Sequence, residues 1–167
     1  MRYLDIWTDG ACKGNPGPGG FGVVVIAPIL NDILDGRIIK LAYSEQSENT
    51  TNNREELKAI LYAFELAATA YKNDICIIHS DSAYCVNICN DWIFNWAKNN
   101  WMNSKKKEVE NIDLIKSLYK YINIDFFNCQ VVKTYGHVGI VENELADALA
   151  TGNKAKFDKI KKEHNLI

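Results

Sequence analysis

Long apolar segments are missing from this chain of 167 residues. No run approaches the roughly 20 consecutive apolar residues that a membrane-spanning helix needs, so we expect no membrane partner. The start turns polar within residues 1–5, which argues against a signal peptide. The balance of 47% hydrophobic and 24% charged residues excludes a disordered or collagen-like chain. Repeats and low-complexity segments are also absent, so we expect one domain over residues 1–167.

The cysteine patterns typical of disulfide frameworks and zinc sites are absent as well. The five cysteines are an odd number, and they form no CxxC pair. Reduced thiols in a cytoplasmic protein are the simplest interpretation of this pattern.

A strong net charge is lacking too. The 19 basic and 21 acidic residues give a net charge of −2, which argues weakly against a polyanionic partner. The distribution is uneven, because residues 98–107 contain four lysines and no acid, and residues 154–163 contain five lysines and two acids. Neutralising four carboxylates with two divalent cations would make the balance positive. The total charge therefore does not decide the partner.

The hydrophobic pattern predicts elements in the order βββαβα(α)αβα. Three early strands, at residues 2–9, 21–27 and 37–43, have links short enough to indicate an antiparallel meander, and a loop is expected around residues 28–36. The near-continuous Val and Ile content of residues 21–27 predicts burial on both faces. The later strands are expected at residues 75–80 and 126–134.

The predicted helices begin after good N-cap residues. The first follows residues 50–53 and runs to about residue 71, and the second starts at Asp81-Ser82. Further helices are predicted at residues 92–98, 111–121 and 142–150, with a basic helical tail at 154–164.

Four acids stand where these elements meet. Asp9 is expected at the end of the first strand and Asp81 at the end of the fourth, while Glu56 lies in the first turn of the long helix and Asp147 on the helix after the last strand. Ligands collect at the carboxyl ends of neighbouring strands in α/β sheets. Each acid alone has an ordinary explanation as a turn, a cap or a solvated charge. The four together are harder to explain in that way.

Clustered carboxylates suggest a chemistry. Such groups cannot all stay ionised without cations, because like charges raise each other's pKa. Oxygen-only ligands suit Mg²⁺ or Mn²⁺. Two such ions roughly 3.5–4 Å apart can activate a water and stabilise the leaving oxygen of a phosphodiester. The pattern therefore favours hydrolysis of nucleic acid.

Several stretches resemble type I ribonuclease H, in the handle-containing form common in bacteria. In chain order they read TDGAC (8–12), GNPGPGG (14–20), TNNREEL (51–57), SDS (80–82), and GH (136–137) with ENE (142–144) and Asp147. The resemblance spans residues 4 to about 150. It implies an α/β (α+β) ribonuclease H-like fold, a five-stranded mixed sheet of three antiparallel then two parallel strands with helices on both faces.

The activity implied by the resemblance is endonucleolytic hydrolysis of the RNA strand of RNA/DNA hybrids by two metal ions. The products implied are 5′-phosphate and 3′-hydroxyl ends. The expected cofactor is a pair of Mg²⁺ ions, with Mn²⁺ as a substitute. The implied metal ligands are Asp9, Glu56, Asp81 and Asp147, with Asp9 shared by both ions.

His137 is implied to aid proton movement or product release from a mobile loop before the last helix of the pattern. Gly136 and Gly139 flank it and make the segment pliable. A neutral imidazole near pH 7 is suited to moving a proton. Without the resemblance, an exposed loop histidine would be the simpler interpretation.

Substrate contacts are implied in the same way. Cys12, Asn15 and Asn52 would line the groove that faces the RNA, whose 2′-hydroxyls distinguish it from DNA. Asn53 would lie near the DNA strand, and Thr51 would help to hold a DNA phosphate, with Arg54 near the same pocket. Helix capping is the alternative role for residues 51–53, and both roles can hold together.

The three tryptophans Trp92, Trp96 and Trp101, together with Lys98, resemble the basic handle of the family, at about residues 91–110. Trp92 and Trp96 are one helical turn apart and should share a face. A satellite hydrophobic cluster is the alternative, and we expect packing and DNA contact together. Ala83 stands where the family often carries an amide that contacts the substrate, so that contact is expected to be missing.

The basic tail, at about residues 153–167, lies outside the catalytic pattern, and a solvated amphipathic helix is expected there. Three other classes of function compete with hybrid hydrolysis. A generic α/β binding protein would need the four acids to be dispersed in space. Transposases, junction resolvases and exonucleases share the carboxylate architecture, but the groove residues and the tryptophans argue against them. A non-catalytic hybrid-binding module should have lost a metal ligand, and here all four positions are filled. A monomer is expected by family analogy.

Overall fold

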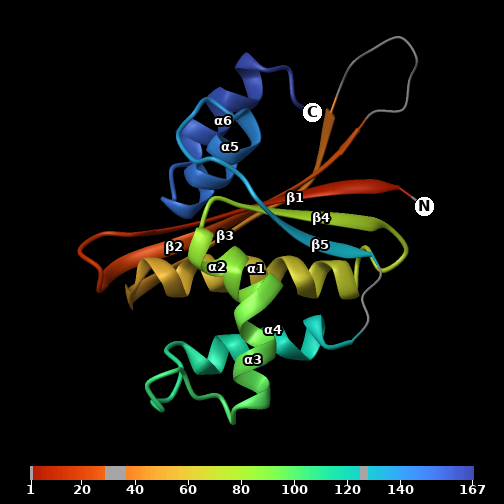
Figure 1. Ribbon diagram of the computed structural model, residues 1–167. Coiled ribbons are helices and arrows are strands. Elements are labelled where there is room, and N and C mark those ends of the chain that lie inside the picture. The colour runs from red at the N-terminus through yellow and green to blue at the C-terminus, as the bar shows by residue number, and fades with distance from the viewer. Residues whose placement is uncertain (1, 29–36, 125–127) are drawn as a thin grey trace.

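The computed structural model describes residues 2–28, 37–124 and 128–167 (Figure 1). Its five-stranded sheet has the order β3-β2-β1-β4-β5. The strands are β1 (Tyr3–Cys12), β2 (Gly17–Pro28), β3 (Arg37–Thr50), β4 (Ile75–Ser80) and β5 (Cys129–Lys133). The first three are antiparallel, and β4 and β5 run parallel to β1. The predicted sheet is therefore confirmed.

Helices cover both faces of the sheet, as predicted. One face carries α1 (Asn52–Ala68), α2 (Ala83–Asn87), α3 (Ile93–Lys98) and α4 (Ile112–Ile122), and the other carries α5 (Val141–Ala150) and α6 (Lys154–Glu163) (Figure 1). The strand β2 is buried on both sides, because Val23 and Val25 join the core under α1 while Val24 and Ile26 join the core under α5 and α6. This alternation explains its almost continuous apolar sequence.

Three strands are longer than predicted, and one of them is β2, which begins at Gly17 rather than at residue 21. The strand β3 continues past Tyr43 to Thr50, because its polar residues still pair with the glycine-rich start of β2, as Ser47 does with Gly19. The strand β1 runs to Cys12, so the prediction that Asp9 ends it was wrong. Asp9 lies inside β1, opposite Gly22 of β2. Backbone pairing, which does not depend on side-chain polarity, extends these strands beyond their apolar stretches.

The helical region after β4 is continuous rather than split in two. A π-helical turn, η1 (Ile88–Trp92), joins α2 to α3, so the chain stays helical from Ala83 to Lys98. Cys85 and Cys89, one turn apart, are both buried in the core. Most of the expected loop at 28–36 and the expected start of the last strand at 126 lie outside the described residues.

The basic tail is docked rather than merely solvated. Phe157 and Ile160 of α6 are buried against residues of β2 and α5. The Ile167 carbonyl accepts a hydrogen bond of 3.0 Å from the backbone N–H of Ile39 on β3. Across the described residues, no helix is both long enough and apolar enough to cross a bilayer.

Candidate active site

Three of the four predicted acids meet where β1 and β4 stop pairing. The pairing of β1 with β4 ends with Thr8 opposite Ser80. Asp9 is the next residue along β1, and Asp81 is the residue that follows β4. Glu56 reaches them from the second turn of α1 rather than the first. Carboxylate oxygens of these three residues lie within 4.8 Å of one another. Asp9 and Glu56 are buried, with 5% and 4% of their surface exposed, and Asp81 is half-buried.

Small residues make this convergence possible. A Cβ on Gly10 would lie 2.3 Å from the backbone nitrogen of Glu56, so the lack of a side chain lets β1 and α1 approach closely. Ser82 caps α2 by accepting a hydrogen bond of 3.2 Å from the Cys85 N–H, and its own N–H donates to Ser80 Oγ at 3.1 Å. The backbone on both sides of Asp81 is therefore fixed.

The fourth acid, Asp147, comes from the opposite face of the sheet. It lies on α5, which packs so closely on β2 that a Cβ on Gly22 would lie 2.4 Å from the Ala146 carbonyl oxygen. Asp147 stands outside the tight group of three but lines the same cavity. Its Oδ2 is 2.8 Å from Nζ of Lys156 on α6.

The acids share an open cavity of about 470 Å³. Its lining is mostly polar and comprises Asp9, Gly10, Ala11, Cys12, Asn52, Glu56, Asp81, Ser82, Gly136, His137 and Asp147. All four predicted metal ligands and the predicted histidine therefore face one space.

Burial and mutual repulsion oppose ionisation of this cluster. Burial, followed by the charges of Asp81 and Asp147, raises the pKa of Asp9 to about 8. Burial, followed by the charge of Asp9, raises the pKa of Glu56 well above its usual value. Carboxylates in this state gain stability when a cation joins them.

The donor set fits divalent cations. Oε2 of Glu56 is buried and has no hydrogen-bond partner in the part of the chain that the structure describes. A buried oxygen without a partner is costly unless a cation or an ordered water meets it. Only oxygen ligands are gathered here, which suits hard divalent cations.

His137 lies at the rim of the cavity, in the loop between β5 and α5. Its backbone has φ of 57°, and Gly139 has φ of 82°. A Cβ on Gly136 would lie 2.5 Å from Oδ2 of Asp81, so this loop passes directly over the acid cluster. His137 itself is exposed.

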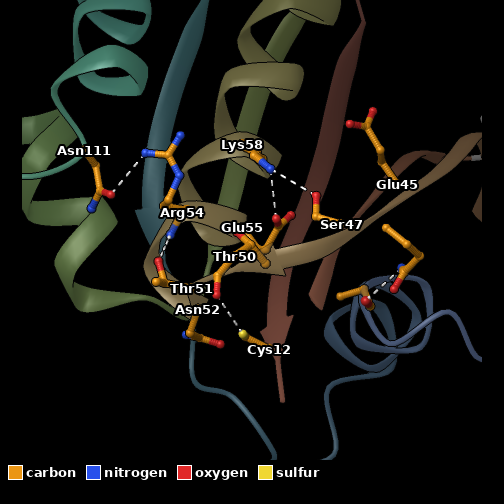
Figure 2. Close-up of polar contacts among 12 residues, drawn as sticks. Cys12, Glu45, Ser47, Thr50, Thr51, Asn52, Arg54, Glu55, Lys58 and Asn111 are labelled. Atoms are coloured by element: carbon orange, nitrogen blue, oxygen red, sulfur yellow. Dashed lines mark hydrogen bonds and ion pairs between the residues drawn. The ribbon is translucent and has the colours of Figure 1, made fainter. Parts of the chain in front are cut away.

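The predicted groove residues lie beside the acids. Cys12 and Asn52 line the cavity of the acids, and Asn15 Oδ1 accepts a hydrogen bond of 2.8 Å from the Asn52 N–H. The Cys12 thiol lies 3.3 Å from the Thr50 carbonyl oxygen (Figure 2). This contact joins the ends of β1 and β3 at the start of α1.

Thr51 both caps α1 and faces a second hollow. Its Oγ1 accepts a hydrogen bond of 3.3 Å from the Arg54 N–H, which confirms the capping role. The second hollow has a volume of about 390 Å³ and is lined by Asn15, Thr51, Asn53, Glu110 and Asn111.

Arg54 forms an ion pair with Asp113 beside this hollow. Its guanidinium is 2.8 Å from Oδ2 of Asp113. It is also 3.4 Å from Oδ1 of Asn111 (Figure 2). The arginine therefore braces α1 against the start of α4.

The handle tryptophans divide into two environments. Trp92 and Trp96 have ring centroids 5.9 Å apart, as their spacing predicts, and they line a hollow of about 880 Å³ together with Lys98 and Lys106. Trp101 is half-buried, and its ring packs edge-on against Tyr119 at 5.4 Å.

Two residues at these sites were not singled out by the sequence. Lys156 contacts Asp147, and Asn111 lines the hollow of Thr51. Lys156 is one of five lysines in residues 154–163, and nothing in the sequence distinguishes it from the others. Asn111 has φ of 57°, a backbone region in which asparagine is enriched, but that conformation is not readable from sequence.

Carboxylates that converge on an open polar cavity are a ligand set typical of metal-dependent phosphoryl-transfer enzymes. Comparison with known proteins narrows the class. A model of the RNase H family matches residues 1–155. The chain therefore belongs to the RNase H family.

Relatives and solved structures agree with this assignment. Ribonuclease H of Caldicellulosiruptor saccharolyticus is 39% identical over 151 residues, which cover 90% of this chain and 94% of that protein. Ribonuclease HI of Pasteurella multocida is 40% identical over 157 residues, covering 90% and 88% of the two chains. The crystal structure of LC9-RNase H1, a type 1 RNase H with the type 2 active-site motif, has a TM-score of 0.75 at 26% identity and covers 90% of this chain and 71% of that one.

Proposed function

We propose that Asp9, Glu56, Asp81 and Asp147 hold two divalent cations for hydrolysis of the RNA strand of an RNA/DNA hybrid. Membership of the RNase H family makes the chain a metal-dependent endonuclease with this activity. The observation that carries the assignment of the residues is the meeting of three carboxylates within 4.8 Å, in a cavity that Asp147 also lines.

The position of each acid would decide which of the two metal ions it binds. The charges of Asp81 and Asp147 both raise the pKa of Asp9, which supports a role for Asp9 as the ligand that both ions share. Divalent cations bound there would activate a water and stabilise the departing 3′ oxygen, leaving 5′-phosphate and 3′-hydroxyl ends. Mg²⁺ is the ion we propose, with Mn²⁺ as a substitute, because the ligands are all oxygens.

His137 would accept or deliver a proton at the rim of the cavity. A neutral imidazole can do both near pH 7, and an exposed position lets it exchange protons with solvent. The loop places it in the lining of the cavity that holds the acids.

The two polar hollows would each bind a different strand of the hybrid. Cys12, Asn15 and Asn52 would face the RNA, where side-chain amides and backbone groups can pair with 2′-hydroxyls. Thr51 and Asn53 would meet a DNA phosphate in the hollow that they line with Asn111. Strand discrimination would then come from having both hollows occupied at once.

The handle would extend this contact along the duplex. Trp92, Trp96 and Lys98 border one hollow, so aromatic faces and a cation are presented together to sugar and phosphate. Trp101 would act mainly by holding the handle to α4, given its packing on Tyr119.

Compartment and assembly are further parts of the proposal. All five cysteines are unpaired, which supports a reducing compartment, and we place the protein in the cytoplasm. We infer that it acts as a monomer, in line with the family resemblance, and sedimentation of the purified chain would test this.

Gel cleavage tests the central proposal. An end-labelled RNA/DNA hybrid is incubated with Mg²⁺ beside double-stranded RNA, single-stranded RNA and duplex DNA, using the native chain and Asp9→Asn. Cutting of the RNA strand of the hybrid alone, lost in the variant, is the expected result. Tight hybrid binding without cutting, in Mg²⁺ and in Mn²⁺, would instead mean a non-catalytic binding module.

A further inference from the structure

The ion pair between Lys156 and Asp147 joins the basic tail to the acid cluster. Nζ of Lys156 is 2.8 Å from Oδ2 of Asp147, and the two side chains are 40% and 21% exposed. Lys154 and Lys159, in contrast, pair with acids of their own helix, Asp158 and Glu163. Among the ion pairs of α6 in the described structure, the one made by Lys156 is the one that leaves the helix.

The docking of α6 onto the rest of the fold fixes the position of Lys156. Asn153 caps the helix by accepting a hydrogen bond of 3.0 Å from the Lys156 N–H, and the Asn153 N–H donates to the Ala148 carbonyl at 2.8 Å. One turn further along, Phe157 and Ile160 are buried against β2 and α5. The start of α6 is therefore held against the end of the helix that carries Asp147.

The ammonium group of Lys156, next to Asp147, changes the charge that a metal ion would find at this carboxylate. Without metal, Lys156 offsets one negative charge of a cluster whose members repel one another. A divalent cation that binds Asp147 competes with Lys156 for the charge of the same carboxylate. A ligand that must break an existing ion pair binds more weakly by the free energy of that pair.

We propose that Lys156 is an internal counter-cation of the metal site, which neutralises Asp147 in the metal-free protein and must release it when a divalent cation binds. The protein thereby weakens the ion held by Asp147 relative to the ion held among Asp9, Glu56 and Asp81. This inference rests on the proposed function, because it assumes that Asp147 is a metal ligand. Lys156 acts through Asp147 and is a positioning residue.

Calorimetric titration of Mn²⁺ into the metal-free full chain tests the idea without relying on activity. Asp147→Asn identifies the binding step that depends on Asp147. In Lys156→Met that step should tighten about two- to fivefold, the range that a partly exposed ion pair supplies. Lys156→Arg keeps the charge and should bind as the native chain does. Lys159→Met removes an equal charge from the same helix and should leave the affinity unchanged.

Thermal unfolding gives a second readout. Metal-free Lys156→Met should melt about 1–3 °C lower than the native chain, because Asp147 loses its counter-charge. The difference should vanish in saturating Mn²⁺, where the cation replaces the lysine. A merely structural lysine would lower the melting temperature equally with and without metal.

The outcomes separate this inference from the proposed function. Unchanged Mn²⁺ affinity in Lys156→Met, or the same change in Lys159→Met, would overturn the role of Lys156 while leaving the metal site intact. A native chain that binds no Mn²⁺ at all would overturn the metal site, and the role of Lys156 with it.

Discussion

Gly10 and the backbone of Glu56 are in closer contact than any other amino acid at position 10 would allow. A Cβ on Gly10 would lie 2.3 Å from the Glu56 nitrogen and 2.6 Å from the Glu55 carbonyl carbon. Both neighbours are backbone atoms of α1, so neither can rotate away. The residue after Asp9 therefore sets how closely Asp9 and Glu56 can approach.

Gly10→Ala should therefore push α1 away from β1. Overpacking of this kind costs about 1–3 kcal/mol, or roughly 2–12 °C in melting temperature for a chain of this size. Hybrid cleavage should fall further than stability alone explains, because Glu56 is displaced from Asp9. Thermal unfolding and cleavage rates on folded protein at low temperature measure the two effects.

Gly20→Ala is the matched control for Gly10→Ala. Its Cβ would meet only the side-chain end of Gln46, at 2.2 Å, and that amide can move. Near-native stability of Gly10→Ala would contradict the close approach of β1 and α1.

The raised pKa of Asp9 predicts that the metal-free protein loses stability as pH rises. The folded protein holds a proton on Asp9 up to a pKa of about 8, whereas the unfolded chain releases it near pH 4. The contribution of Asp9 to the free energy of unfolding is therefore full below about pH 4 and declines between about pH 4 and 8. Above that range it no longer changes. Denaturant unfolding in EDTA across this range measures the decline.

Asp9→Asn should remove this part of the pH dependence. The metal-free variant should exceed the native chain in stability by an amount on the order of a few kcal/mol near pH 8.5, and match it near pH 4. Glu48→Gln, a change at an exposed acid, is the control and should keep the native profile. Parallel profiles for the native chain and Asp9→Asn would refute the buried, repelled state of Asp9.

His137→Ala should lower kcat by about 100- to 10,000-fold while KM changes little, because a proton carrier acts on the chemical step or on release and not on hybrid binding. Steady-state cleavage measures the two constants. His164→Ala alters an exposed residue at the end of α6 and serves as the control. A rise in KM at constant kcat would assign His137 to substrate binding instead.

Much of the fold could be predicted because its signals are local. The Val and Ile run of β2 requires two covered faces, and the Thr51 and Ser82 caps mark where α1 and α2 begin. Asp9 and Asp81 were found because they directly follow the last paired residues of two parallel strands, β1 and β4.

Other features depend on contacts between distant segments. The strand β3 extends through a polar stretch because β2 pairs with it, and no apolar alternation marks that extension. Lys156 reaches Asp147 because two apolar residues dock α6, a relation that the lysine-rich sequence does not express. Arg54 lies within the matched stretch of residues 51–57, but it pairs with Asp113, whose position is set by α4.

Trp101→Ala and Trp92→Ala should affect different properties, the first stability and the second hybrid binding. Trp101 is half-buried against Tyr119, so its loss should cost about 2 kcal/mol and lower the melting temperature by roughly 4–8 °C. Trp92 is 37% exposed and borders the hollow of the handle, so its loss should weaken hybrid binding with a smaller change in stability. Thermal unfolding and fluorescence anisotropy separate the two, and similar profiles for both variants would contradict the division.

The lysines of the handle should set the salt dependence of hybrid binding. Lys98 and Lys106 are exposed and line the same hollow as Trp92 and Trp96. The loop that carries Lys106 is ordered by Asn103, whose Oδ1 accepts hydrogen bonds from the Lys105 and Lys107 N–H groups at 2.9 and 3.1 Å. The backbone that carries Lys106 is therefore ordered without the hybrid.

Each phosphate contact adds about 0.7–0.9 to the slope of log affinity against log salt concentration. The double variant Lys98→Ala/Lys106→Ala should lower that slope by about 1.4–1.8, measured by anisotropy in the non-cleaving Asp9→Asn background. Lys159→Ala, on α6 across the sheet from the handle (Figure 1), removes a charge that faces no part of this hollow and should keep the native slope. If affinity fell without a change in slope, the handle lysines would be acting by packing, and the phosphate contacts would have to lie elsewhere on the protein.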